Sequence, residues 1–299
     1  MSSNKLSRFL DDVGKKIQIR NETFRQCVAE FAGMFVLVFI GDCSVAQADI
    51  FKDESGGSFF VINICYAIAV VFGLLVCAGV SGGHMNPAVT LAMGVFGELP
   101  WFKVPLYMLS QYAGGFVAAA MVYVTYRETL IHKYGDNRFD VKYAGIFTTF
   151  PREHMTGAAG FLDQVIGTAV LLLMVCAIVD KRNMKVPEYL IPAYAGLGVA
   201  GIGMSLGYQC GYPINPARDF GPRLFTFVGG WGSAVFTAYN YWAWIPMVAC
   251  HIGGVLGVVI YKVFIQNHWP PLYEVTAQTQ MQNQLAMDQI PLKRELTEP

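Results

Sequence analysis

Long apolar segments separated by short polar connections make up most of this chain. A helix that spans a membrane needs about 20 mostly apolar residues. Six segments meet this requirement, at roughly 26–46, 59–80, 101–126, 160–179, 189–208 and 242–265. Tryptophans lie near the ends of the third and sixth segments, where aromatic residues settle at membrane interfaces. The pattern therefore predicts an all-α membrane protein with six transmembrane helices.

Two polar stretches interrupt this pattern, GGHMNPAVT at 82–90 and GYPINPARD at 211–219. Each Asn-Pro-Ala predicts a helix start with asparagine as the cap, because proline is well tolerated in the first turn. A helix from Pro87 to about Phe96 spans only ~15 Å, about half of a ~30 Å hydrocarbon core. We expect two half-helices that meet end to end from opposite sides. Their motifs are Asn86, Pro87, Ala88, Asn215, Pro216 and Ala217.

The two halves of the chain repeat each other. Glu30 lies early in the first span and precedes Asn86 by 56 residues, and Asp163 lies early in the fourth and precedes Asn215 by 52. Each half holds three spans, an odd number, so the second copy crosses the membrane in the opposite sense. Inverted repeats of this kind occur in many transport proteins. We expect one domain at 24–266, with repeats at about 24–130 and about 156–266.

Irregular backbone at membrane depth is tolerated only against protein or a water-filled cavity. A pore would satisfy the segments before the two motifs, whose carbonyl groups would line it. The half-helices would aim positive dipole ends at its centre, where the asparagine amides donate hydrogen bonds and the field opposes cations and protons. Glu30 and Asp163 are expected to hold the two loops by accepting hydrogen bonds. The predicted lining is Ser81, Gly82, Gly83, His84, Cys210, Gly211, Pro213 and Ile214.

Composition narrows the classes of function. Charged residues make up 14% of the chain, against about 25% in soluble domains. The net charge of zero argues against a nucleic-acid partner. The seven cysteines are scattered without a CxxC spacing, which indicates small core residues rather than disulfides or a metal site. We expect no cofactor and no metal.

Basic residues predict the orientation in the membrane. The first 25 residues hold six lysines and arginines, and the 180–188 connection holds three more. Because such residues favour the cytoplasmic side, we place both termini there, with tails at 1–23 and 267–299. The basic residues of the 127–159 connection argue in the opposite direction.

With these motifs the sequence resembles the major intrinsic proteins, the aquaporin family, over residues 24–266, and most of all their aquaglyceroporin branch. The similarity to this branch rests on Asp219 after Arg218, on Pro246-Met247, and on the segments FGPRLF, GWGSAVFT and FTTFP. The resemblance implies a passive channel for glycerol and water, with urea and other small neutral solutes as further candidates, rather than an enzyme. It also implies a homotetramer, which we expect in the plasma membrane.

The resemblance further implies a selectivity filter near the extracellular mouth, formed by Tyr66, Gly203, Tyr212 and Arg218. Gly203 replaces the histidine of water-selective relatives and is expected to widen the constriction. The tyrosine rings suit the carbon-bound hydrogens of glycerol, while Arg218 donates to hydroxyls and repels cations. Tyr66 departs from the usual Phe or Trp, and its hydroxyl either points away or enters the filter. Asp219 is expected to pair near the second half-helix start and to help fix Arg218.

Other interpretations stay open. His84 is either a neutral, hydrogen-bonded imidazole or a candidate pH gate, since histidine changes charge near physiological pH. A secondary transporter would use Glu30, His84 and Asp163 as proton carriers. A water-only pore is the nearest rival, disfavoured by Gly203 and Asp219. An intramembrane enzyme is disfavoured because the sequence holds no HExxH or serine–histidine arrangement.

Overall fold

The computed structural model describes residues 5–52, 58–270, 280–282 and 284–285. The chain divides into two compact units, Met1–Val259 and Ile260–Pro299. The first unit holds the half-helices and all of the membrane helices except the end of the last one. Most of the tail predicted at 267–299 lies outside the described residues.

Six helices in the described part of the chain are long and apolar enough to cross a membrane. Each overlaps one of the six predicted segments, and no β-strand occurs among the described residues. The predicted all-α membrane fold is confirmed. The helices are α2 (Glu22–Ile50), α3 (Phe59–Ser81), α5 (Lys103–Tyr134), α6 (Gly157–Val179), α7 (Ile191–Cys210) and α10 (Trp244–Phe264).

Several helices extend beyond the apolar segments because local caps, rather than hydropathy, set their ends. α2 begins at Glu22, and the Asn21 side chain accepts a hydrogen bond from the N–H of Phe24 at 2.9 Å. α5 continues to Tyr134, well beyond the apolar segment that predicted it, and ends where Gly135 takes a positive φ of 56°.

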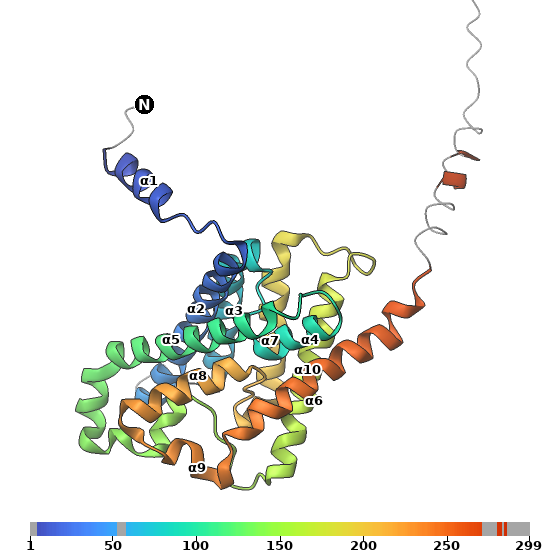
Figure 1. Cartoon of the computed structure of the whole chain (residues 1–299). Helices are drawn as coiled ribbons and strands as arrows, with labels where there is room; N and C mark the ends of the chain where they lie inside the picture. Colours follow the sequence, from blue (N-terminus) through green and yellow to red (C-terminus); the bar gives the residue numbers. More distant parts are fainter. Residues whose placement is uncertain (1–4, 53–57, 271–279, 283, 286–299) are drawn as a thin grey trace, which may run out of the picture. The chain divides into compact units, whose positions relative to one another are not determined.

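The two short helices predicted from the Asn-Pro-Ala motifs are α4 (Pro87–Val95) and α8 (Pro216–Thr226) (Figure 1). Asn86 and Asn215 cap them, and each side-chain oxygen accepts from the N–H two residues further on, at 2.9 and 3.0 Å. α4 has nine residues and α8 eleven. At ~1.5 Å per residue, each is far shorter than a ~30 Å hydrocarbon core.

The order of these elements repeats. Helices α2, α3, α4 and α5 correspond to α6, α7, α8 and α10, so each repeat supplies two spans, a half-helix and a third span. A Cβ at Gly115 of α5 would lie 2.7 Å from the carbonyl oxygen of Ala217 in α8. A Cβ at Gly254 of α10 would lie 2.9 Å from that of Ala88 in α4. Because only glycine permits this approach, the third span of each repeat is fitted to the half-helix of the other.

The remaining elements are short. α1 (Lys5–Ile17) precedes α2, and α9 (Ala234–Tyr241) lies between α8 and α10 in the sequence. The connection from α5 to α6 forms one wall of the site described below. Further helical turns occupy Gly135–Phe139, Val141–Ile146, Glu188–Leu190, Phe227–Trp231 and Gln266–His268.

Candidate functional site

The tips of the two half-helices are in direct contact. Asn86 Nδ2 donates to the carbonyl oxygen of Ile214 at 2.9 Å, and Asn215 Nδ2 donates to that of Met85 at 2.7 Å. Each bond joins a motif of one repeat to the loop of the other. A carboxamide carries two N–H donors. One donor of each asparagine cross-links the repeats, and Asn215 Nδ2 also contacts Met34 Sδ at 3.9 Å.

The loops before the two motifs share one backbone conformation. In each loop, the residues four, three and one positions before the asparagine have positive φ. They are Gly82, Gly83 and Met85, with φ of 90°, 71° and 46°, and Gly211, Tyr212 and Ile214, with φ of 73°, 34° and 37°. Such backbone is strained for residues other than glycine, and this strain gathers at functional sites. Tyr212 stands at the position of the second loop that corresponds to Gly83 in the first. The second loop therefore carries an aromatic ring where the first has none.

Glu30 of α2 is fully buried and holds the first loop. Its Oε1 accepts from the N–H of His84 at 3.0 Å, and its Oε2 accepts from the N–H of Met85 at 2.7 Å. Ser81 Oγ and Gln111 Nε2 also donate to this carboxylate. Four donors therefore satisfy a charge that would be costly to bury unpaired.

Contrary to the prediction, Asp163 does not hold the second loop by accepting hydrogen bonds from its backbone. The Asp163 carboxylate accepts from the side chains of Gln164 and Gln209, at 2.8 and 3.1 Å. The N–H of Ile214 donates instead to Gln164 Oε1 at 3.3 Å. Consecutive helical residues point about 100° apart, and the inward position of α6 belongs to the buried Gln164. Gln164 is thus the counterpart of Glu30.

Two cavities adjoin these loops. The cavity beside Asn86 and Asn215, here called the inner cavity, has a volume of about 210 Å³. The cavity beside the α5–α6 connection, here called the outer cavity, has a volume of about 290 Å³. Among the described residues, only Tyr66, Tyr212 and Arg218 line both. Of the predicted lining residues, the inner cavity is bordered by Gly82, Gly83, His84, Pro213 and Ile214, and the outer one by Gly211.

Two predicted lining residues border neither cavity. Ser81 is buried, and its carbonyl accepts a hydrogen bond from the Tyr107 hydroxyl at 3.1 Å, so it is not turned to the lumen. Cys210 is fully buried at the end of α7. The prediction is wrong for these two positions because each still belongs to a packed span, and the exposed backbone begins one residue later.

Positive charge gathers at the outer cavity, whose lining includes Lys142, Arg152 and Arg218. Lys142 Nζ lies 3.5 Å from Asp140 Oδ2, and the negative charge of Asp140 raises the pKa of Lys142 above its ordinary value. The ammonium group of Lys142 therefore stays charged at neutral pH.

The hydroxyl of Tyr66 is directed at a carboxylate in α2. It donates to Asp42 Oδ1 at 2.7 Å, and Asp42 is fully buried and borders neither cavity. A Cβ at Gly41 would overlap the Tyr66 ring, so the glycine before Asp42 makes room for it. The ring packs edge-on against Tyr212, with centroids 6.0 Å apart. Of the two orientations left open by the sequence, the structure has the hydroxyl turned away from the cavities.

Arg218 lies beside Tyr66, where the two cavities meet. Its Nη1 donates to the carbonyl oxygen of Phe147 at 2.9 Å and lies 3.4 Å from Asp42 Oδ1. Its guanidinium carbon is 5.0 Å from the centroid of the Tyr66 ring. Asp42 therefore contacts two of the three residues that line both cavities.

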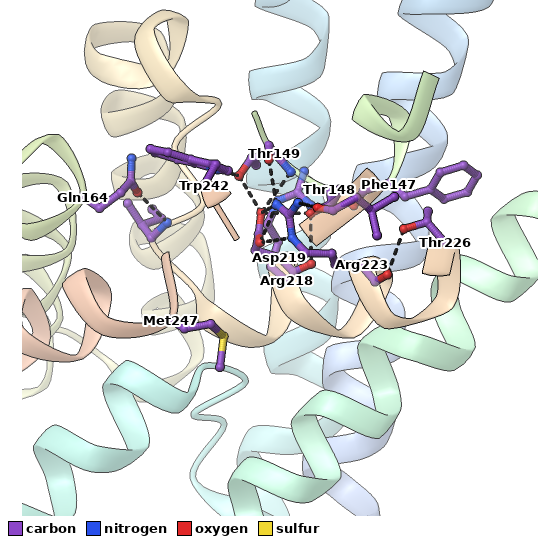
Figure 2. A network of polar contacts seen from close by, with 12 residues as sticks. Phe147, Thr148, Thr149, Gln164, Arg218, Asp219, Arg223, Thr226, Trp242 and Met247 are labelled. Carbon is purple, nitrogen blue, oxygen red and sulfur yellow. Dashed lines mark hydrogen bonds and ion pairs between the residues drawn. The ribbon is translucent and has the colours of Figure 1, made fainter. Parts of the chain in front are cut away.

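Asp219, which was expected to pair near the second half-helix start, pairs with Arg223 four residues further along α8 rather than with its neighbour Arg218. Its Oδ1 accepts from Arg223 Nε and Nη2 at 3.0 and 2.9 Å, and its Oδ2 accepts from the N–H of Thr149 at 2.9 Å. Figure 2 shows the threonines of the α5–α6 connection and Arg223 gathered around Asp219. Asp219 is one residue beyond Arg218 on α8 and points in another direction. Its bonds to Thr148 and Thr149 fix the segment whose Phe147 carbonyl accepts from Arg218.

Gly203 also differs from its prediction, because it borders neither cavity. A Cβ there would overlap Asn63 Oδ1 and lie 2.7 Å from Tyr212 Cζ. The absent side chain thus leaves space for the Tyr212 ring rather than opening the passage directly.

Sequence reasoning missed four buried polar residues of the site: Asp42, Gln111, Gln164 and Arg223. A signal existed for each. Asp42, Gln111 and Gln164 are polar residues inside predicted spans, and such residues are functional candidates by default. Asp219 and Arg223 stand four residues apart, the spacing at which opposite charges meet on a helix.

Comparisons with known proteins agree with this geometry. A profile of the family described as Major intrinsic protein matches residues 18–261. The chain is 42% identical to aquaporin-10 of Homo sapiens, with 85% of each chain covered, and 43% identical to aquaporin-9 of Mus musculus, with 86% of this chain and 90% of that protein covered. The X-ray structure of the aquaglyceroporin from Plasmodium falciparum matches with a TM-score of 0.74 and 29% identity, over 81% of this chain and 97% of that one. The resemblance inferred from the sequence is confirmed.

Proposed function

The chain belongs to the major intrinsic protein family, and we propose that it is a passive channel for glycerol and water. The observation that carries this proposal is the meeting of two cavities at Tyr66, Tyr212 and Arg218. A solute that moves from the outer to the inner cavity passes between these side chains. They form the proposed selectivity filter, with Gly203 behind Tyr212 as the residue that sets its width.

The chemistry of the passage suits a small polyol. Arg218 presents several N–H donors to hydroxyl groups, and the two tyrosine rings offer apolar surface to carbon-bound hydrogens. Beyond the filter, the motif loops face a wall of aliphatic side chains. A molecule with hydroxyls on one edge and hydrocarbon on the other fits both walls, and urea is a further candidate. The aliphatic wall includes Leu37, Val70, Leu74, Val89, Val175 and Val199.

The same passage opposes ions. A cation would meet the Arg218 charge and then the N-terminal ends of α4 and α8, whose dipoles are positive there. Protons face the same field. We therefore extend the proposal to exclusion of ions and protons.

A rocking transporter is the principal alternative, and the contacts between the repeats argue against it. The two half-helix tips are cross-linked by the bonds from Asn86 and Asn215, and each half-helix packs on a glycine of the other repeat. Moving one repeat against the other would break both sets of contacts. A fixed pore keeps them.

The wider setting belongs to the same proposal. The channel domain comprises residues 24–266, flanked by tails at 1–23 and 267–299. Six helices of membrane-spanning length make this an integral, multi-pass membrane protein. We propose a homotetramer with one pore per subunit in the plasma membrane, with both termini in the cytoplasm on the grounds of the basic residues near the N-terminus.

Stopped-flow light scattering on proteoliposomes tests the function. We expect rapid entry of water, glycerol and urea but not of sorbitol, with flux proportional to the solute gradient. An imposed proton gradient or membrane voltage should leave glycerol flux unchanged. Saturable flux that follows the proton gradient would favour the transporter, and water entry without glycerol entry would favour a water-only pore.

A further inference from the structure

Helix α1 carries an apolar stripe that the described protein leaves uncovered. At 100° per residue, Leu6, Phe9, Leu10, Val13 and Ile17 fall within one arc of about 100°. Phe9, Leu10 and Ile17 are 63, 57 and 71% exposed, and no residue of α1 is buried. All charged residues of the helix lie outside this arc.

Such a helix needs a surface to hold it. α1 has 13 residues, and isolated helices shorter than about 12–15 residues are marginal in water even for favourable sequences. Gly14 lowers the intrinsic helix stability further. Helices of this kind are held mostly by packing of their apolar face.

We propose that α1 lies flat on the membrane, with its stripe between lipid headgroups and acyl chains of a leaflet that contains anionic lipid. The short connection between α1 and the first membrane helix indicates that lipid covers the stripe. Only four residues separate Ile17 from the start of α2, and a segment of that length reaches at most ~14 Å. The stripe is therefore tethered to the bilayer surface through which α2 passes.

Charge points to the same partner. The polar face of α1 carries more basic than acidic residues. The basic ones are Lys5, Arg8, Lys15 and Lys16, and the acidic ones are Asp11 and Asp12. On the helical wheel, Lys5 and Lys16 adjoin the edge of the stripe near Phe9, where their long stems can extend toward headgroup phosphates. A basic polar face opposite an apolar face is typical of helices that bind anionic interfaces.

Hydrogen–deuterium exchange on the full-length protein in vesicles tests this proposal. In vesicles of phosphatidylcholine with phosphatidylserine, we expect the amides of residues 5–17 to exchange at least about tenfold more slowly in wild type than in Leu10→Glu. Ser7→Glu adds the same charge to the polar face and should keep the wild-type rate. Lys15→Gln/Lys16→Gln should lower protection in these vesicles but not in phosphatidylcholine alone.

Three results would overturn the proposal. The first is rapid exchange of residues 5–17 in wild-type protein in vesicles, and the second is equal protection in Leu10→Glu. The third is protection that rises with protein density, which would assign the stripe to a second copy of the chain. Equal protection with and without phosphatidylserine would remove the anionic lipid from the proposal. The inference does not rest on transport, and glycerol flux equal to wild type in Leu10→Glu would show that the variant is folded.

Discussion

The Tyr66 hydroxyl donates to Asp42 Oδ1 at 2.7 Å, and Arg218 Nη1 lies 3.4 Å from the same oxygen. One buried carboxylate thus contacts two residues that line both cavities. It keeps the phenol out of the passage and offsets part of the Arg218 charge. Asp42 is therefore a positioning residue for the proposed filter.

Removing this carboxylate should narrow the passage. In Asp42→Ala the Tyr66 hydroxyl loses its acceptor, and a buried hydroxyl without a partner costs about 1–3 kcal/mol. The hydroxyl regains a partner by turning toward the aqueous passage. We expect glycerol flux to fall about tenfold, equivalent to ~1.4 kcal/mol, and water flux to fall less because water is smaller. Stopped-flow measurements on proteoliposomes give both rates.

Two further variants separate this effect from general damage. Tyr66→Phe alone should conduct glycerol much as wild type does, since its ring is unchanged. Asp42→Ala/Tyr66→Phe should recover most of the glycerol flux, because no hydroxyl remains to enter the passage. A double variant as impaired as Asp42→Ala would show that Asp42 acts through the fold instead.

Gly203 controls the position of Tyr212. A Cβ at this residue would overlap Asn63 Oδ1 and crowd Tyr212 Cζ, so the ring must shift toward the passage. We expect Gly203→Ala to lower glycerol flux about threefold, or ~0.7 kcal/mol, and Gly203→His to lower it further, each with a smaller effect on water. The ratio of glycerol to water flux measures this.

Gly201→Ala is the matched control on the same helix. A Cβ at Gly201 meets nothing within 4 Å, so this variant should keep the wild-type ratio. Equal losses of glycerol and water flux in Gly203→Ala would contradict the assignment of Gly203 to the filter.

The fold was predictable because its signals are local. Apolar segments of spanning length predicted the six helices, and Asn-Pro-Ala predicted both half-helices, since a capping asparagine and a first-turn proline fix a helix start. The ends of the spans were less predictable, as α5 shows, because polar turns continue a helix beyond the apolar segment.

The partners inside the site were not predictable in the same way. Asp163 and Gln164 are neighbours in the sequence, yet only Gln164 faces the second loop, and hydropathy does not say which face of α6 is inward. Likewise Asp219 stands beside Arg218 but pairs with Arg223, because residues four apart share a helix face. Such contacts depend on helix rotation and packing.

His84 supplies a test of pH dependence. It borders the inner cavity, its Nδ1 lies 3.2 Å from Thr90 Oγ1, and its N–H donates to Glu30. A proton on the imidazole would draw the ring toward the Glu30 carboxylate and away from the cavity. We expect wild-type glycerol flux to rise about twofold as the pH falls from ~7.5 to ~5.5, because histidine can gain a proton as the pH falls below neutrality.

His84→Ala should abolish this change, and its flux should stay level over the same pH range. His251→Ala is the control, because His251 borders neither cavity and its Nδ1 lies beside the Met247 carbonyl oxygen. Parallel pH profiles in wild type and His84→Ala would leave His84 as a neutral, hydrogen-bonded residue.

The Asp219–Arg223 pair should be required for stability. Both side chains are fully buried, and Arg223 also donates to the carbonyl oxygens of Val235 and Thr149. Arg223→Met leaves Asp219 buried without its cation, which costs about 3–5 kcal/mol. We expect the Tm in detergent to fall by at least about 6 °C, measured by size-exclusion chromatography after heating.

Arg127→Met is the control. It breaks the exposed pair with Glu128 and should leave the Tm within ~1 °C of wild type. Asp219→Asn/Arg223→Met should recover part of the loss because no unpaired charge remains, and an unchanged Tm in Arg223→Met would show that the buried pair does not hold this wall of the passage.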